Sequence, residues 1–222
     1  MADGIRVVGV VDAVAGALRD AILSGVLRAD DVVTEASVAE RFDVARPSAK
    51  AAIERVVADG LLVRTAHRSA RVRSLDAPAI LDVYATRARL EGAALRELAS
   101  ARRVPVAARD AQAEIAGHLG GSTVDIVEPD MRFHTALVDA IASERMTRAY
   151  AALVDEVRLC MTQVQGRRLV SVDTILAEHD RILARLADGD ATAAVAELDG
   201  HLQRAGRRLA DAIEAAPTDA AR

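Results

Sequence analysis

The sequence predicts a mainly α-helical protein with two parts, a small N-terminal helical domain that ends in a β-hairpin and a larger all-α antiparallel bundle. Two observations support this prediction. The 222 residues are 51% hydrophobic while aromatic residues make up only 2%, a composition typical of helical proteins. Apolar residues also recur with the three- to four-residue period of a helix over most of the chain, and short segments containing Gly, Pro or Asp interrupt them.

The N-terminal domain is predicted over residues 8–74. Helical spacing of apolar residues predicts helices over 10–25, 34–42 and 46–60, with Pro47 in the first turn of the third and Gly60 at its end. The three-residue break between the second and third helices is typical of a helix-turn-helix. The alternating segments 61–65 and 70–74 follow directly and predict a two-stranded wing. The fold predicted for this domain is therefore a winged helix-turn-helix.

The net charge of −4 averages over two unlike parts of the chain. Residues 41–73 carry eight basic side chains against three acidic ones, a local charge of +5, so the remainder carries −9. A basic segment on an otherwise acidic protein fits a surface that binds a polyanion such as double-stranded DNA. Charge alone does not separate this reading from an ordinary solvated face, but the helix-turn-helix pattern favours DNA.

The second domain is predicted over residues 76–214 as an all-helical antiparallel bundle. Asp76 and Pro78 mark its start, as a helix cap and a first-turn proline. The apolar pattern and its breaks predict helices near residues 77–101, 104–119, 128–142, 144–165, 171–188 and 191–214. We expect residues 215–222 to form a disordered tail.

Several classes of site are missing from the sequence. It contains no glycine-rich phosphate loop, no Gly-x-Ser-x-Gly elbow and no Cys-x-x-Cys pair. Cys160 is the single cysteine, lies in an apolar segment and is predicted to pack in the core. No apolar run is long enough to cross a membrane, so we predict a cytoplasmic protein that binds no membrane.

Three histidines and one aspartate of the bundle are candidate ligands of a metal ion. Asp130 and His134 stand four residues apart and therefore share one face of a helix. His179 and His201 lie ten residues before and twelve after Gly189, so in an antiparallel hairpin they face each other at similar height. Imidazoles with one carboxylate suit a divalent transition ion. Simple hydrogen-bonded packing of the same side chains is the alternative.

The N-terminal domain resembles the winged helix-turn-helix of GntR-family transcription regulators. The resemblance rests on the run ALRDAILSGVLRADDVVTEASVAERFDVARPSAKAAIERVVADGLLVR and on HRSARV at the wing. It implies that Arg46 and Lys50 meet DNA, with His67 and Arg68 near the tip of the wing. The physical chemistry agrees, because a guanidinium at the start of the recognition helix can read a guanine edge, while a lysine one turn further on suits a phosphate.

The second domain resembles the FCD domain of the FadR subfamily of these regulators. The resemblance rests on RARLE (87–91) and on a pattern met by Asp130, His134, Glu178-His179 and His201. It implies a small carboxylate effector held inside the bundle by one divalent transition-metal ion per chain, whose ligands are Asp130, His134, His179 and His201. Arg87 is implied as the partner of the effector's carboxylate, and Arg158 is a second cationic candidate. The ligands do not distinguish Zn, Ni, Mn and Fe.

Together these predictions describe a transcription regulator whose DNA affinity responds to effector and metal, and the family resemblance implies that it acts as a repressor. A palindromic operator needs two reading heads, so we expect a homodimer. Two alternatives stay open, a metal-free regulator with a structural polar cluster and a hydrolase whose metal activates water. A hydrolase would leave the winged domain without a function. Beyond the ligands, only Glu178 could serve as its general acid or base. We therefore predict that the protein is not an enzyme.

Overall fold

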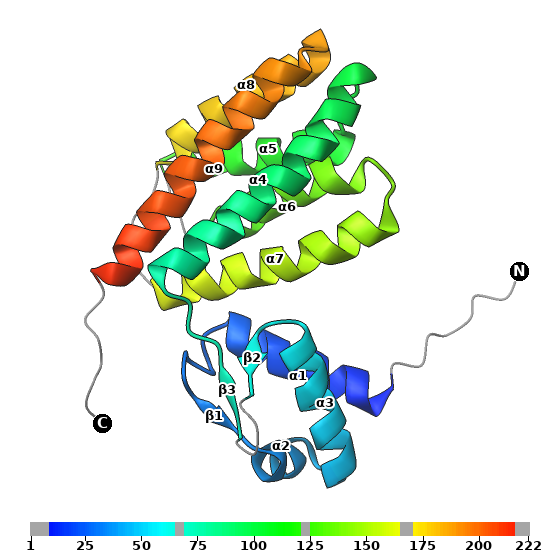
Figure 1. Ribbon diagram of the computed structural model, residues 1–222, viewed down its shortest axis with the longest axis vertical. Coiled ribbons are helices and arrows are strands. Elements are labelled where there is room, and N and C mark those ends of the chain that lie inside the picture. The colour runs from blue at the N-terminus through cyan, green and yellow to red at the C-terminus, as the bar shows by residue number, and fades with distance from the viewer. Residues whose placement is uncertain (1–8, 65–68, 121–124, 165–170, 216–222) are drawn as a thin grey trace, which may run out of the picture. The chain divides into compact units, whose positions relative to one another are not determined.

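The computed structural model describes residues 9–64, 69–120, 125–164 and 171–215. The chain divides into two compact units, Met1–Ser74 and Leu75–Arg222, whose helices and strands are labelled in Figure 1. Both units are mainly helical, which confirms the predicted fold class. Within the described ranges, no helix is both long and apolar enough to cross a membrane.

The described residues of the first unit form three helices and a small antiparallel sheet. Its helices are α1 (Val10–Leu23), α2 (Glu35–Phe42) and α3 (Arg46–Ala58), and its strands are β1 (Val32–Val33), β2 (Leu62–Val63) and β3 (Ala70–Val72). The order in the sheet is β1-β3-β2, so the predicted hairpin of β2 and β3 gains a third strand. Strand β1 was not predicted because two residues are too short to display an alternating pattern.

The turn between α2 and α3 is fixed by local chemistry. Thr34 and Ser37 form a capping box at the start of α2, in which the Thr34 side chain accepts a hydrogen bond from the Ser37 backbone N–H at 3.0 Å. Asp43 ends α2 in the left-handed region with a φ of 49°. Helix α3 then begins at Arg46, with Pro47 in its first turn. Only three residues therefore separate α2 from α3, as is typical of a helix-turn-helix.

The second unit is a bundle of six described helices, each of which lies close to a predicted one. They are α4 (Ala77–Ser100), α5 (Val106–Gly117), α6 (Val127–Asp139), α7 (Glu144–Gln163), α8 (Val172–Asp188) and α9 (Ala191–Glu214). Side chains of Asp76, Ser143, Ser171 and Asp190 cap the starts of α4, α7, α8 and α9. Gly189 joins α8 to α9 with a φ of 79°, a conformation that favours glycine.

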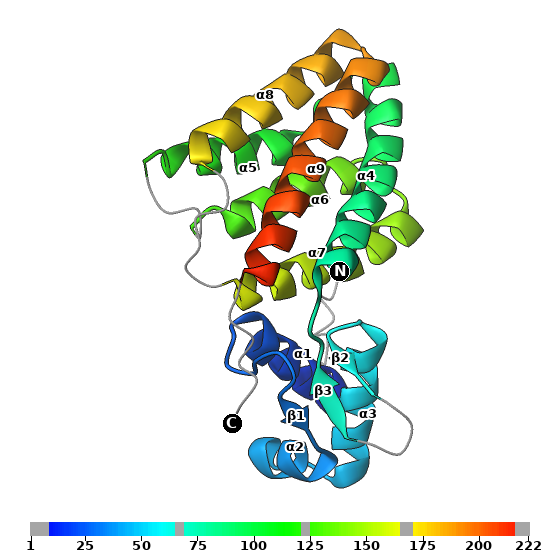
Figure 2. The same ribbon diagram turned by 60° about the vertical axis from the view of Figure 1, so that its left-hand side comes forward.

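Helices α4 and α9 lie side by side along much of their length (Figures 1 and 2). Their close approach depends on Gly206, because a Cβ atom there would lie only 2.9 Å from the ring of Tyr84 on α4. Tyr84 itself is 4% exposed. This packing brings the interior faces of both helices toward α6 and α8, where the polar side chains of the unit collect.

Candidate metal centre

Three helices bring the four candidate ligands together. Helix α6 supplies Asp130 and His134 one turn apart, α8 supplies His179 and α9 supplies His201. One ligand atom from each of the four lies within 4.8 Å of the others. The three histidines are buried and Asp130 is half-buried. Pro129 occupies the first turn of α6, so it starts the helix beside Asp130 without breaking a helical hydrogen bond.

The ring nitrogens of the histidines point at a common centre. The Nε2 atoms of His134 and His201 are 3.2 Å apart. Oδ1 of Asp130 lies 3.4 Å from Nε2 of His179 and 4.0 Å from Nε2 of His134. Within the described part of the chain, this Oδ1 and the Nε2 of His179 are buried without a hydrogen-bond partner. A buried polar atom without a partner costs about 1–3 kcal/mol, and a cation at the centre would remove that cost for both atoms.

The opposite ring nitrogen of each histidine has a partner of its own. Nδ1 of His134 lies 2.6 Å from Oε2 of Glu91, and Nδ1 of His201 lies 2.7 Å from Oε2 of Glu178. Nδ1 of His179 lies 3.2 Å from Oε1 of Gln112. An oxygen acceptor on Nδ1 holds the proton there and leaves the Nε2 lone pair for a metal ion. The donor set therefore fits a divalent transition ion.

Burial and charge set the protonation of these groups. Burial, with the neighbouring His201 and His134, holds the pKa of His179 well below its usual range. Burial also lowers the pKa of His201, against the opposing effect of the Glu178 carboxylate. Both rings are therefore neutral at pH 7, the form that binds metal. Burial raises the pKa of Glu91, but the neighbouring His134 and Arg87 and the hydrogen bonds from His134 and Tyr150 outweigh it and bring the pKa to about 2.

Phe133 completes the apolar wall of the cluster. Its ring stacks on that of His179 with centroids 3.7 Å apart and an interplanar angle of 3°. Phe133 is completely buried. It packs next to the ligands and offers no ligand atom, so its role is to fix the plane of the His179 ring.

Arg87 lies beside the cluster with one nitrogen unsatisfied. The side chain is 1% exposed, its Nε donates to Oε1 of Glu91 at 3.1 Å, and its guanidinium lies 5.0 Å from the centre of the Tyr84 ring. Its NH2 is buried and has no partner among the described residues. Arg87, Asp130 and His201 line one cavity of about 60 Å³. The cavity therefore has both a free guanidinium donor and ligand atoms in its wall.

The sequence also suggested Arg158 as a partner of the effector. In the structure, Arg158 donates to both oxygens of Glu128 at 2.9 Å and to Asp155 at 3.0 Å. It is not among the described residues that line the 60 Å³ cavity. Arg87 and Arg158 are therefore not brought together.

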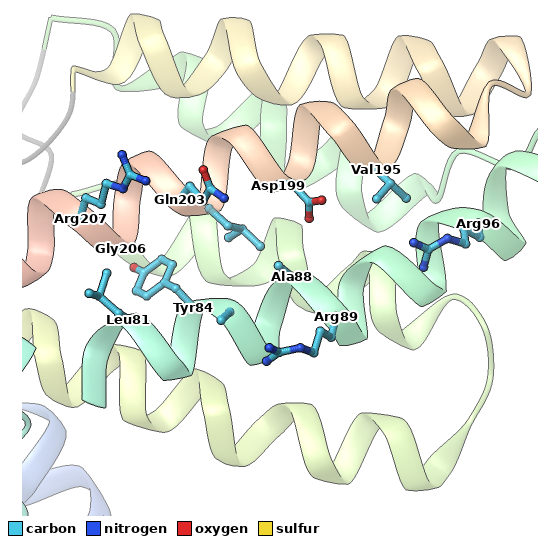
Figure 3. Close-up of a pocket in the computed structure, with 12 residues that line it drawn as sticks. Leu81, Tyr84, Ala88, Arg89, Arg96, Val195, Asp199, Gln203, Gly206 and Arg207 are labelled. Atoms are coloured by element: carbon cyan, nitrogen blue, oxygen red, sulfur yellow. The ribbon is translucent and has the colours of Figure 1, made fainter. Parts of the chain in front are cut away.

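A larger groove runs between α4 and α9 (Figure 3), with a volume of about 590 Å³. Of the described residues that line it, none is a candidate ligand. Tyr84 lines both the groove and the 60 Å³ cavity, and its ring packs against Gly206. The chemistry of the second unit is thus concentrated in the smaller cavity, although the groove is the roomier of the two.

The candidate DNA-contacting residues lie partly within the described structure. Arg46 and Lys50 are exposed one turn apart at the start of α3. His67 and Arg68 lie outside the described residues. The first unit therefore presents two neighbouring cations at the N-terminal end of the helix that a helix-turn-helix inserts into the major groove.

Sequence reasoning missed the partners of the ligands. It gave no role to Glu91, Gln112 or Tyr150, and it treated Glu178 only as a candidate acid or base. The structure engages Glu178 with His201 on α9 and with Arg204 at 2.7 Å. Arg87 and Glu91 stand four residues apart on α4, and this spacing could have predicted that the two side chains pair. The other partners come from separate helices, so spacing along the chain did not reveal them.

Comparisons with known proteins identify both units. The model of the bacterial regulatory proteins of the gntR family matches residues 10–72, and that of the FCD domain matches residues 82–204. The chain is 25% identical over 198 residues to the Nta operon transcriptional regulator of Aminobacter aminovorans, which covers 86% of this chain and 90% of that protein. The matched families and this relative are regulators, which confirms the prediction that the chain is not an enzyme.

Two solved structures are similar over nearly the whole chain. A GntR transcriptional regulator from Rhodococcus sp. RHA1 matches with a TM-score of 0.75 at 24% identity, over 93% of this chain and 98% of that one. McbR/YncC of E. coli matches with a TM-score of 0.68 at 14% identity, over 88% of this chain and 94% of that one. At these identities the likeness establishes the fold.

The lowered pKa values predict that the metal-free second unit loses stability between pH 7.5 and 5.5. His179 and His201 resist protonation when folded, whereas in the unfolded chain they protonate near pH 6.5. The unfolded state then binds more protons, and each histidine costs at most about 1.4 kcal/mol per pH unit below that value. Glu178 and Glu91, whose pKa values are lowered, contribute only below about pH 4.5.

Urea unfolding of chelator-treated protein, followed by circular dichroism at both pH values, checks this expectation. His179→Gln should reduce the pH dependence, and His118→Gln, a change at the end of α5, should leave it unchanged. Equal stability of the parent protein at pH 7.5 and 5.5 would contradict the expected burial of neutral imidazoles.

Proposed function

The chain belongs to the gntR family of bacterial regulatory proteins and carries an FCD domain, and from this premise we propose that a metal ion and a small carboxylate bound in the second unit control its affinity for DNA. Transcription regulation follows from the family; the metal, the effector and their coupling are the proposal. The observation that supports it best is the convergence of three imidazoles on Asp130, each with an acceptor on its other ring nitrogen.

The proposed ion is a divalent transition metal held by Asp130, His134, His179 and His201. Three neutral imidazoles and one carboxylate match the preferences of Zn, Ni, Mn and Fe. When bound, the ion supplies a Lewis acid that attracts carboxylate oxygens. The residues of the chain keep the site ready for it, since the acceptors on Nδ1 fix each ring and Phe133 excludes water from one side.

The charges around the cavity support a role for the ion in effector binding. Among the described residues, the cavity is lined by the cations Arg87, Arg204 and Arg208 and by the carboxylates Asp130 and Glu178. Arg87 is paired with Glu91 and Arg204 with Glu178, and this pairing weakens their attraction for an anion. A divalent ion would add two positive charges, so an anionic effector would be attracted more strongly when the metal is present.

The shape of the cavity limits the proposed effector. A volume of about 60 Å³ has room for roughly four to six atoms of the size of a water oxygen. The NH2 of Arg87 is buried and has no acceptor among the described residues. A carboxylate suits a guanidinium because it can accept two parallel hydrogen bonds from it. We therefore propose a compact organic acid, with Arg87 as its cationic partner in the protein.

The proposed output is a change in how two copies of the first unit meet DNA. Arg46 reads base edges in this scheme, Lys50 binds a phosphate, and His67 and Arg68 follow at the wing. We propose a homodimer on a palindromic operator, because two-fold protein symmetry matches two half-sites. The proposed action as a repressor rests on the family resemblance alone. A coupling of about 1–3 kcal/mol between effector and DNA would change affinity by about 5–150-fold.

We expect elemental analysis of the purified protein to find about one divalent ion per chain. His179→Ala and His201→Ala should each contain clearly less, because each removes a ligand, whereas His118→Ala should match the parent. Negligible metal in all four proteins would reject the ion and favour the alternative in which the polar cluster of a metal-free regulator is structural.

We expect Arg46→Ala and Lys50→Ala to weaken DNA binding differently. Loss of Arg46 should cost about 1–3 kcal/mol on the specific site and little on random duplex, while loss of Lys50 should weaken both alike. Fluorescence anisotropy with the DNA flanking the protein's own gene and with random duplex measures both. Arg145→Ala, an exposed change in the second unit, is the control, and equal losses for Arg46→Ala on the two duplexes would exclude base reading by this residue.

We expect small carboxylates to raise the melting temperature only when metal is present. Acetate, which is small enough for the cavity, should be compared with citrate, which is too large for it, in a thermal-shift assay with Zn²⁺ and with chelator, since binding stabilises the folded state by mass action. Arg87→Lys keeps the charge but loses the forked donor, so it should weaken the affinity for acetate by about tenfold or more and reduce the shift in melting temperature. Arg158→Lys should respond like the parent. An unchanged response in Arg87→Lys would remove Arg87 from the effector site.

A further inference from the structure

We propose that Glu91 is the positioning residue that orients the metal ligand His134 and the effector partner Arg87 at the same time, an inference that rests on the proposed function. Neither the family match nor the sequence pattern gives this residue a role. Glu91 lies on α4 and is completely buried. Its two carboxylate oxygens serve different parts of the site.

One oxygen of Glu91 faces the effector side and the other faces the metal side. Oε1 accepts from Nε of Arg87 at 3.1 Å and from the hydroxyl of Tyr150 at 2.6 Å. Oε2 lies 2.6 Å from Nδ1 of His134. The contact with Oε1 uses Nε of Arg87 and leaves its NH2 for a ligand in the cavity. The contact with Oε2 keeps the His134 proton on Nδ1 and leaves Nε2 for the ion.

Only a carboxylate satisfies this arrangement. Three donors face Glu91 when His134 carries its proton on Nδ1, so both of its oxygens must accept. A glutamine has the same shape but offers one oxygen and one NH2 group. The glutamine oxygen can accept either from Arg87 and Tyr150 or from His134. The NH2 group then faces the remaining donor or donors, and no hydrogen bond forms there.

The orientation of a glutamine amide at position 91 depends on which of the facing donors needs an acceptor more. Arg87 is charged and, at 1% exposed, cannot withdraw to water. Together with Tyr150 it presents two donors against the single donor of His134. The amide oxygen of Glu91→Gln should therefore face Arg87, and its NH2 group should face Nδ1 of His134. His134 must then move its proton to Nε2, the atom that faces the ion.

Glu178 provides a comparison within the same site. It stands behind His201 as Glu91 stands behind His134, with Oε2 at 2.7 Å from Nδ1, and its Oε1 accepts from Arg204. The Arg204 side chain is 47% exposed, however. In Glu178→Gln the guanidinium of Arg204 can rotate away and be solvated. The amide oxygen can then face Nδ1 of His201, so that His201 keeps its proton on Nδ1. Loss of the carboxylate should therefore matter more at Glu91 than at Glu178.

The experiment measures Co²⁺ binding to the full chain by competition with a chromophoric chelator, and the visible absorption of the bound Co²⁺. We expect Glu91→Gln to bind Co²⁺ about 10–100-fold more weakly than the parent, with an altered spectrum because His134 no longer offers its lone pair. Glu178→Gln should lose clearly less affinity. Glu97→Gln, an exposed change on the same helix, should match the parent in both readouts.

The acetate response separates the two sides of Glu91. At Co²⁺ concentrations that saturate each protein, Glu91→Gln should keep the parent's thermal response to acetate, because its oxygen still positions Arg87. Parent-like Co²⁺ affinity and spectrum in Glu91→Gln, or a larger loss in Glu178→Gln, would overturn the inference and leave the proposed function standing. A parent protein that binds no Co²⁺ would overturn the proposed function and this inference with it.

A second measurement does not depend on a variant that folds. In chelator-treated, ¹⁵N-labelled parent protein at pH 7.5, the imidazole nitrogens report the tautomer directly. We expect His134 to carry its proton on Nδ1, where Glu91 accepts it. A proton found on Nε2 instead would overturn the proposed role of Glu91.

Discussion

The second unit depends on one constraint, namely that a fully buried carboxylate must be surrounded by donors. Burying an isolated carboxylate costs several kcal/mol, and the cost is recovered only with good geometry and complete hydrogen bonding. Glu91 meets this demand with Arg87 from its own helix, His134 from α6 and Tyr150 from α7. These contacts fix α4, α6 and α7 relative to one another, and the positions of Asp130 and His134 on α6 follow from that.

The same logic extends outward through the other imidazoles. Gln112 on α5 holds His179 of α8, and it donates in turn to the Leu176 carbonyl at 3.0 Å and to Asp180 at 2.7 Å. Glu178 on α8 holds His201 of α9. Each ring is thus oriented from a different helix. A ligand that changed the polar centre would act on all these helices together, which supports the proposed coupling between this centre and DNA binding.

Much of the fold was predictable because its signals are local. The periods of apolar residues and the cap at Asp76 predicted the helices to within a few residues. The predicted ends were less accurate, since α1 stops at Leu23 and Gly25 follows it with a φ of 75°. Strand β1 escaped prediction because its two residues are too few to show an alternating pattern, and its pairing with β3 joins residues far apart in sequence.

The sequence by itself determined which side chains gather at the centre of the bundle. The four-residue spacing of Asp130 and His134 and the near-symmetric placement of His179 and His201 about Gly189 put the ligand types on facing helices. Only the tertiary structure decided what stands behind them. The contacts of Glu91, Gln112 and Glu178 with the three imidazoles, and the separation of Arg158 from the cavity, depend on how the helices are rotated against one another. Packing fixes that rotation, and periodicity along one helix does not encode it.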